Sequence, residues 1–170
     1  VRIAPIWEGA NGIQALDLAG RKMPKNMGRL LRRFFHPALA FIDTKKEDKN
    51  LKEFIIPFEK ALKGLQKTTL FMAQKGLSNP YEIGAGATDY LKQFGIVAMG
   101  YMWLKMLKVA FSKEERDDYY KYKIITGRFF FERILPETLF RAISISSGSK
   151  TIMSMPDEGF NSVSKFSGIV

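Results

Sequence analysis

Apolar residues recur at helical spacing along most of the chain. The most regular example advances in steps of four and three: Leu51, Ile55, Phe58, Leu62, Leu65, Thr69 and Met72. Such steps place side chains on one face of an α-helix, which then packs lengthwise against another helix. The pattern predicts a long helix that Pro57 kinks or restarts, because proline cannot donate within it. Gly76, followed by Leu77, is the expected C-terminal stop.

Capping residues predict a second long helix. Asn79, Pro80 and Glu82 combine an N-cap, a proline at the first helical position and a glutamate at the third, and the helix then runs to about Phe111. Its middle, 94–104, is apolar all round, but this is well short of the roughly 20 residues that a bilayer span needs. We therefore expect a buried central helix. Four glycines are expected to let neighbouring helices approach it closely: Gly84, Gly86, Gly95 and Gly100.

Weaker boundaries fall on either side of these two helices. Between 26 and 50 we expect a helix interrupted at His36–Pro37 and followed by a charged linker over 43–50. Ser112 and Glu115 form a capping box for a further helix. Its buried face is expected to carry Tyr120, Ile124, Gly127, Phe131 and Ile134. Pro136 should break that helix and begin a last one, which Gly148 closes. The neighbouring aromatic side chains are expected in the core: Tyr119, Tyr122, Phe129 and Phe130.

No stretch carries a strand pattern, so the sequence predicts an all-α fold, a helical bundle. We expect three parts: residues 1–25, a helical domain over 26–160, and a flexible tail over 161–170. The boundary near 25 rests on Pro24, because the residue before proline is pushed out of helix.

Composition limits the chemistry. The chain has 170 residues, no cysteine and one histidine, so disulfides and thiolate metal sites are excluded and no metal site is expected. The net charge of +10 permits binding to nucleic acid, an anionic membrane or a polyanionic ligand such as coenzyme A, and selects none of them. A stand-alone basic helical module that binds nucleic acid or a membrane is therefore the alternative reading. Four basic residues share a helical face: Lys25, Arg29, Arg32 and Arg33. Aromatic residues are not interleaved among them, so we expect a solvated face and no nucleic acid.

The candidate chemistry lies near the start of the chain. Glu8 stands on a short loop just before a helix that Asn11 is expected to cap, with Gln14 three places on. Free N–H groups at a helix N-terminus favour a negative partner. On spacing alone, however, a surface glutamate before an ordinary helix is the simpler interpretation.

The stretch from Trp7 to Gln14 resembles the catalytic loop and following helix of flavin-dependent acyl-CoA dehydrogenases, which usually read aromatic-Glu-Gly-Thr and then Ile-Gln. The resemblance implies that Glu8 is the base that removes the α-proton of an acyl-CoA thioester. It places the substrate carbonyl near the backbone of Glu8 and Gly9, and FAD against Ala10, Asn11 and Gly12. This chain departs from the pattern with Trp7 for tyrosine and Ala10 for threonine, which removes a hydroxyl contact to the flavin.

Later stretches resemble the helical C-terminal extension of one subgroup of this family, which includes the methylmercaptopropionyl-CoA dehydrogenases. They are Ala87–Leu91, Phe94–Gly95, Lys123–Phe131 and Arg133–Glu137. The resemblance implies that residues 1–25 end the dehydrogenase core and 26–160 form the extension. It further implies the rest of the core as a partner, electron-transfer flavoprotein as electron acceptor and a homodimer. The early motif and the absence of an initiating methionine suggest part of a longer polypeptide, inactive by itself. The first residues lack a signal peptide, so we expect a cytoplasmic protein.

Overall fold

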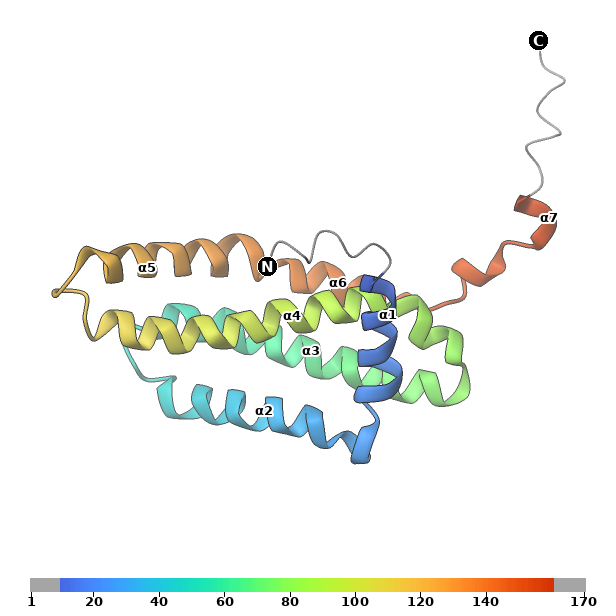
Figure 1. Cartoon of the computed structure of the whole chain (residues 1–170), viewed down its shortest axis with the longest axis horizontal. Helices are drawn as coiled ribbons and strands as arrows, with labels where there is room; N and C mark the ends of the chain where they lie inside the picture. Colours follow the sequence, from blue (N-terminus) through green and yellow to red (C-terminus); the bar gives the residue numbers. More distant parts are fainter. Residues whose placement is uncertain (1–9, 161–170) are drawn as a thin grey trace, which may run out of the picture.

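The computed structural model describes residues 10–160, and within that range every regular element is a helix. Four long segments lie side by side, and a short first helix crosses them near one end (Figure 1). The elements are α1 (Ala10–Leu16), the π-helical segment η2 (Asp17–Lys22), α2 (Lys25–Lys45), α3 (Lys52–Ser78), α4 (Pro80–Phe111), α5 (Asp118–Phe129), the π-helical segment η3 (Phe130–Ile134), α6 (Glu137–Ser146), the 3₁₀ turn η4 (Ile152–Ser154) and α7 (Asp157–Phe160). The predicted all-α helical bundle is confirmed.

α4 is the central helix of the bundle. It packs against α1, α3, α5 and α6, and its side chains at Tyr90, Val97, Leu104 and Leu107 are fully buried. By length and composition, α4 is also the one helix among residues 10–160 that could cross a membrane. Because four helices of the same chain pack against it, we interpret α4 as the core helix of the bundle. One side of it stays exposed and carries Met99, Met102 and Val109.

The apolar seam of α3 is confirmed at all seven positions, each of which is buried. Sequence spacing missed three further buried residues beside it: Phe54, Ala61 and Thr68. The helix continues through Pro57 and does not start afresh there. It also passes Gly76 and ends at Ser78. Gly76 is needed for packing, since a Cβ there would stand 2.5 Å from the side chain of Ile83 on α4.

Other helix boundaries were predicted with mixed success. The Asn79 cap is confirmed, because its side chain accepts a hydrogen bond from the Tyr81 N–H at 3.1 Å. The capping box at Ser112 is wrong: Ser112 ends α4, and Asp117 caps α5 by accepting from the Tyr119 N–H at 2.8 Å. Asp117 has the extended backbone that an N-cap requires, with φ −160° and ψ 135°. The predicted interruption at His36–Pro37 is also wrong, since α2 runs through it.

A sharp change of direction separates α1 and η2 from the body of α2. Asn26, Met27 and Gly28 have φ of 50°, 54° and 75°, three successive left-handed residues. The break falls close to the boundary expected near residue 25. Nevertheless, Ala15 and Ala19 belong to the same buried core as the rest of the bundle. The division into domains at this point stays a prediction.

The four glycines of α4 do not share one role. A Cβ at Gly100 would stand 3.1 Å from Phe58, and one at Gly86 would stand 3.3 Å from Ile145, so these two do allow close approach. At Gly84 and Gly95 a Cβ would meet nothing within 4 Å. The expectation of close packing is therefore wrong for these two, which lie on the exposed side of the helix.

The aromatic cluster after residue 118 was expected in the core, and only part of it lies there. Phe130 and Phe131 are buried and Tyr120 is half-buried against the core. Tyr119, Tyr122 and Phe129 instead face solvent. A helix turns through its full circle every 3.6 residues, so a dense aromatic run cannot place all its rings on one buried face.

Candidate functional site

The start of α1 holds the described part of the predicted site. Glu8 and Gly9 lie outside the described residues, so their predicted roles remain predictions. Ala10, Asn11 and Gly12 form the first turn of α1, where Ala10 is half-buried and the other two are exposed. Because the helix already includes Ala10, Asn11 lies within the first turn, and its predicted N-cap role is wrong.

The opposite face of α1 anchors this turn to the bundle. Ala15 and Ala19 are fully buried, and α1 and η2 both pack on α4. Small side chains at these positions let the short helix lie close to α4, so its N-terminal turn has a fixed place. An ion pair at the surface supports the same segment. Asp17 accepts from Arg21 and lies 2.9 Å from the Lys22 ammonium. The hydrogen bonds from Arg21 and then Lys22 lower the pKa of Asp17 to about 2.

The first turn of α1 suits a large anionic group. The leading N–H groups of a helix have no acceptor within it, and the helix dipole favours negative charge at that end. Among the described residues, nothing lies within 4 Å of a Cβ built on Gly12, so none of them fills the space beside the backbone there. The residues present are therefore suited to contact a phosphate-bearing cofactor such as FAD through their backbone N–H groups.

A buried polar network joins α3, α4 and α6. The fully buried Gln93 accepts a hydrogen bond from the Thr68 hydroxyl at 2.8 Å and donates to the Thr138 carbonyl at 3.3 Å. Next to it, the Tyr90 and Thr69 hydroxyls lie 2.8 Å apart. Burial raises the pKa of Tyr90 to about 12. With each group partnered, this network fixes the register of the three helices and offers no free base or nucleophile.

A second polar cluster joins α4 and α6. Asp89 on α4 receives a hydrogen bond from Arg141 Nη1 at 3.0 Å and another from the Ser144 hydroxyl at 2.6 Å. Arg141 also pairs with Glu137 at 3.1 Å, within α6. Sequence reasoning missed this clamp, because it joins residues 52 positions apart. The available sign was a carboxylate, Asp89, within a helix that is expected to be buried.

Glu82 forms a third link, between the start of α4 and the end of α6. Its carboxylate accepts from the Ser149 hydroxyl at 2.7 Å and from the Ser149 N–H at 3.2 Å. Gly148, just before, has φ +69° and ends α6 as predicted. Glu82, predicted as a capping residue of its own helix, thus holds the chain as it leaves α6.

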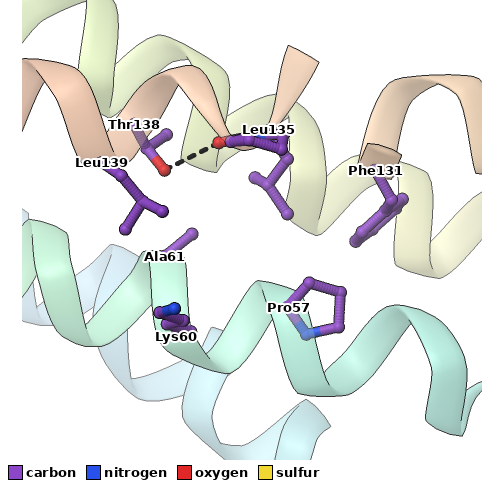
Figure 2. A pocket seen from close by; sticks show the side chains of 8 residues that line it. Pro57, Lys60, Ala61, Phe131, Leu135, Thr138 and Leu139 are labelled. Carbon is purple, nitrogen blue, oxygen red and sulfur yellow. Dashed lines mark hydrogen bonds between the residues drawn. The ribbon is translucent and has the colours of Figure 1, made fainter. Parts of the chain in front are cut away.

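A small cavity opens between α3 and the η3–α6 segment (Figure 2). It measures about 200 Å³, and its lining is mostly apolar: Pro57, Lys60, Ala61, Phe131, Leu135, Pro136, Thr138 and Leu139. The Thr138 hydroxyl donates to the Leu135 carbonyl at 2.7 Å, the bond drawn in Figure 2. Among the described residues that line it, Lys60 alone is charged, and they include no pair of groups suited to acid–base or nucleophilic chemistry.

The remaining candidates are consistent with surface positions. His36, the one histidine of the chain, lies exposed on α2. Between residues 10 and 160, no group of three or more potential metal ligands comes together. Arg29, Arg32 and Arg33 are exposed on α2, but the left-handed break at Asn26–Gly28 separates Lys25 from them, so the predicted shared face is wrong for Lys25. The aromatic rings of α2 lie elsewhere, because Phe34, Phe35 and Phe41 all pack on the core. The solvated-face interpretation therefore accounts for this surface.

Comparison with known proteins matches residues 34–156 to the family described as acetyl-CoA dehydrogenase C-terminal like. The butyryl-CoA dehydrogenase of Syntrophomonas wolfei is 26% identical over 166 residues, covering 94% of this chain and 27% of that protein. The broad-specificity linear acyl-CoA dehydrogenase FadE5 of Mycobacterium tuberculosis is 24% identical over 172 residues, covering 94% and 28%. This chain thus spans about a quarter of the length of these relatives. The match over most of the bundle shows that the chain belongs to the acetyl-CoA dehydrogenase C-terminal-like family.

Proposed function

We propose that this chain works within a longer, cytoplasmic, FAD-dependent acyl-CoA dehydrogenase that oxidises an acyl-CoA thioester to the 2,3-enoyl-CoA. The observation that carries the proposal is the motif around Glu8, which leads directly into a helix anchored on a bundle of this family. The names of the two relatives, butyryl-CoA dehydrogenase and broad-specificity linear acyl-CoA dehydrogenase, support the substrate class. They also favour straight acyl chains.

In the proposed reaction, the Glu8 carboxylate takes the proton from the α-carbon of the thioester. The backbone N–H groups of Glu8 and Gly9 stand at the substrate carbonyl, where they stabilise the negative charge that develops as the proton leaves. Bound FAD would supply the acceptor for the hydride that departs from the β-carbon. A double bond between the α- and β-carbons remains, and electron-transfer flavoprotein is the proposed final electron acceptor.

In this proposal α1 positions the reacting groups. Ala15 and Ala19 hold the helix against α4, so the loop before Ala10 starts from a rigid element. Ala10, Asn11 and Gly12 would contact the cofactor through their backbone N–H groups. The Ala10 side chain has no hydroxyl to offer the cofactor, and Gly12 has no side chain that would keep the cofactor away from the backbone.

The test is Glu8→Gln in the complete enzyme. Glutamine keeps the size and the backbone of glutamate but cannot accept the proton, so turnover should fall by about 10²–10⁴-fold, the usual contribution of a positioned base. Flavin content and acyl-CoA binding should survive, since the loss lies in the chemical step. Anaerobic bleaching of the flavin by a saturated acyl-CoA measures that step directly. A mutant flavin reduced at the wild-type rate would show that the base lies elsewhere.

A further inference from the structure

A groove lies between the end of α4 and the start of α5. It measures about 370 Å³, and most of the residues that line it are apolar or aromatic: Met106, Val109, Ala110, Tyr119 and Tyr120. Ala110 is buried, whereas Met106 and Val109 are partly exposed along the groove. A volume above about 300 Å³ with a mainly apolar lining is typical of a site for a small molecule.

Two lysines also line the groove, and their ammonium groups rest on aromatic rings. Lys123 is half-buried, with its ammonium 5.4 Å from the ring centroid of Trp103 and 5.6 Å from that of Tyr119. The Lys105 ammonium lies 4.4 Å from the Tyr101 ring centroid. Neither lysine takes part in an ion pair within residues 10–160. Partial burial costs an ammonium solvation, and an aromatic face offsets only part of that cost, so the groove holds positive charge that lacks a counter-charge.

The acidic side chains near this end of the bundle have other positions and partners. Asp117 caps α5, and Asp118 pairs with Lys121 at 2.9 Å. Glu114 and Glu115 line a separate hollow. No carboxylate belongs to the described lining of the groove, so its charge is positive and it favours an anion.

We propose that this groove binds an aliphatic monocarboxylate. The chain of the ligand lies along Met106 and Val109, because burial removes apolar surface from water and the flexible methionine adapts to its shape. The carboxylate contacts the Lys123 ammonium, and Lys105 adds positive charge from α4. Both cations lie at one end of the groove, since Lys123 covers Trp103 and Lys105 stands just before Met106. The α4–α5 connection and α1 lie towards opposite ends of the bundle (Figure 1), so this inference does not depend on the proposed reaction.

Isothermal titration calorimetry of the complete protein with octanoate, below its micelle concentration, tests the site. The chain of octanoate is long enough to follow α4 from Lys105 to Ala110, about 7.5 Å of helix axis. An anion of about ten non-hydrogen atoms should bind with a dissociation constant of about 1 mM or tighter. Octylammonium has the same chain but a positive end, and should bind at least about 10-fold more weakly.

Three variants assign the binding to the groove. Lys123→Gln removes the positive charge at the carboxylate and should raise the dissociation constant for octanoate about 10-fold. Lys123→Arg keeps the charge and should retain the affinity within about 3-fold. Lys108→Gln is the matched control, because Lys108 is exposed on α4 and lines a different hollow, so its affinity for octanoate should not change. Circular dichroism during heating establishes that each variant is folded.

Several results would overturn the proposal. One is a wild-type protein that binds no octanoate at about 10 mM, well above the expected dissociation constant. Another is an octanoate affinity that stays unchanged in Lys123→Gln, or that falls equally in Lys108→Gln, since either places the ligand elsewhere. Binding to phosphatidylglycerol vesicles without binding of free octanoate would indicate a membrane surface instead.

Discussion

Close packing at Gly127 gives a sharp test of the bundle. Gly127 is buried within α5 and faces the fully buried Leu107 of α4. A Cβ at position 127 would stand 2.7 Å from Leu107 Cδ2 and 3.2 Å from two further atoms of that side chain. Contacts this short require Leu107 or the whole of α5 to shift, and overpacking of this kind costs about 1–3 kcal/mol.

Alanine also stabilises the helix itself, and this gain must be subtracted from the cost of overpacking. Replacing glycine by alanine inside a helix stabilises it by about 0.5–1 kcal/mol. We therefore expect Gly127→Ala to lower the free energy of unfolding by up to about 2.5 kcal/mol net. For a chain of this length, that lowers the thermal midpoint by up to about 10 °C.

Gly95→Ala is the matched control. Gly95 lies on the exposed side of α4, and a Cβ there meets nothing within 4 Å. Only the helix-propensity gain remains, so this variant should raise the midpoint by about 1–4 °C. Circular dichroism at 222 nm during heating, together with urea titration, measures both variants.

A double-mutant cycle assigns the cause. Leu107→Ala by itself should cost about 2–5 kcal/mol. Combined with Gly127→Ala it should cost less than the sum, because the added methyl enters space that the leucine has vacated. Equal stabilisation by Gly95→Ala and Gly127→Ala would refute the reasoning, since it would mean that α4 and α5 are not in close contact at this point.

Two further predictions concern single side chains. Trp103 is half-buried: its ring centroid lies 6.0 Å from that of Phe130, and the Lys123 ammonium lies 5.4 Å from the Trp103 ring centroid. Trp103→Ala should therefore lower the free energy of unfolding by about 1–3 kcal/mol, less than the roughly 3–5 kcal/mol of a fully buried tryptophan. An unchanged urea midpoint would contradict this packing. Tyr90→Phe should cost about 0.5–1.5 kcal/mol at neutral pH through loss of the bond to Thr69. Because folding raises the pKa of Tyr90 from 10.0 to about 12, its stabilising effect is complete below pH 10 and is lost as the pH rises towards 12. Urea titration at pH 7 and pH 11 should therefore show a smaller difference between wild type and Tyr90→Phe at the higher pH, and an unchanged difference would argue against burial of the hydroxyl.

Local pattern determined much of this fold before any tertiary contact was considered. The seam from Leu51 to Met72 names buried positions correctly because a regular repeat shows which face of a helix avoids water. Asn79 and Pro80 mark the start of α4 because the cap uses only neighbouring backbone groups. The candidate site was predicted from sequence alone, and its central residues, Glu8 and Gly9, lie outside the described part of the chain, so their roles stay predictions.

Tertiary packing decided what local pattern left ambiguous. Gly76 was read as a helix stop, yet the helix continues and uses its missing side chain to make room for Ile83. Gly100 and Gly95 have the same local chemistry, and only the approach of Phe58 distinguishes them. The clamp between Asp89 and Arg141 and the outward position of Phe129 likewise depend on which helix lies opposite. A repeat in the sequence shows which face of a helix is apolar, whereas the packing of all the helices together decides which other helix covers that face.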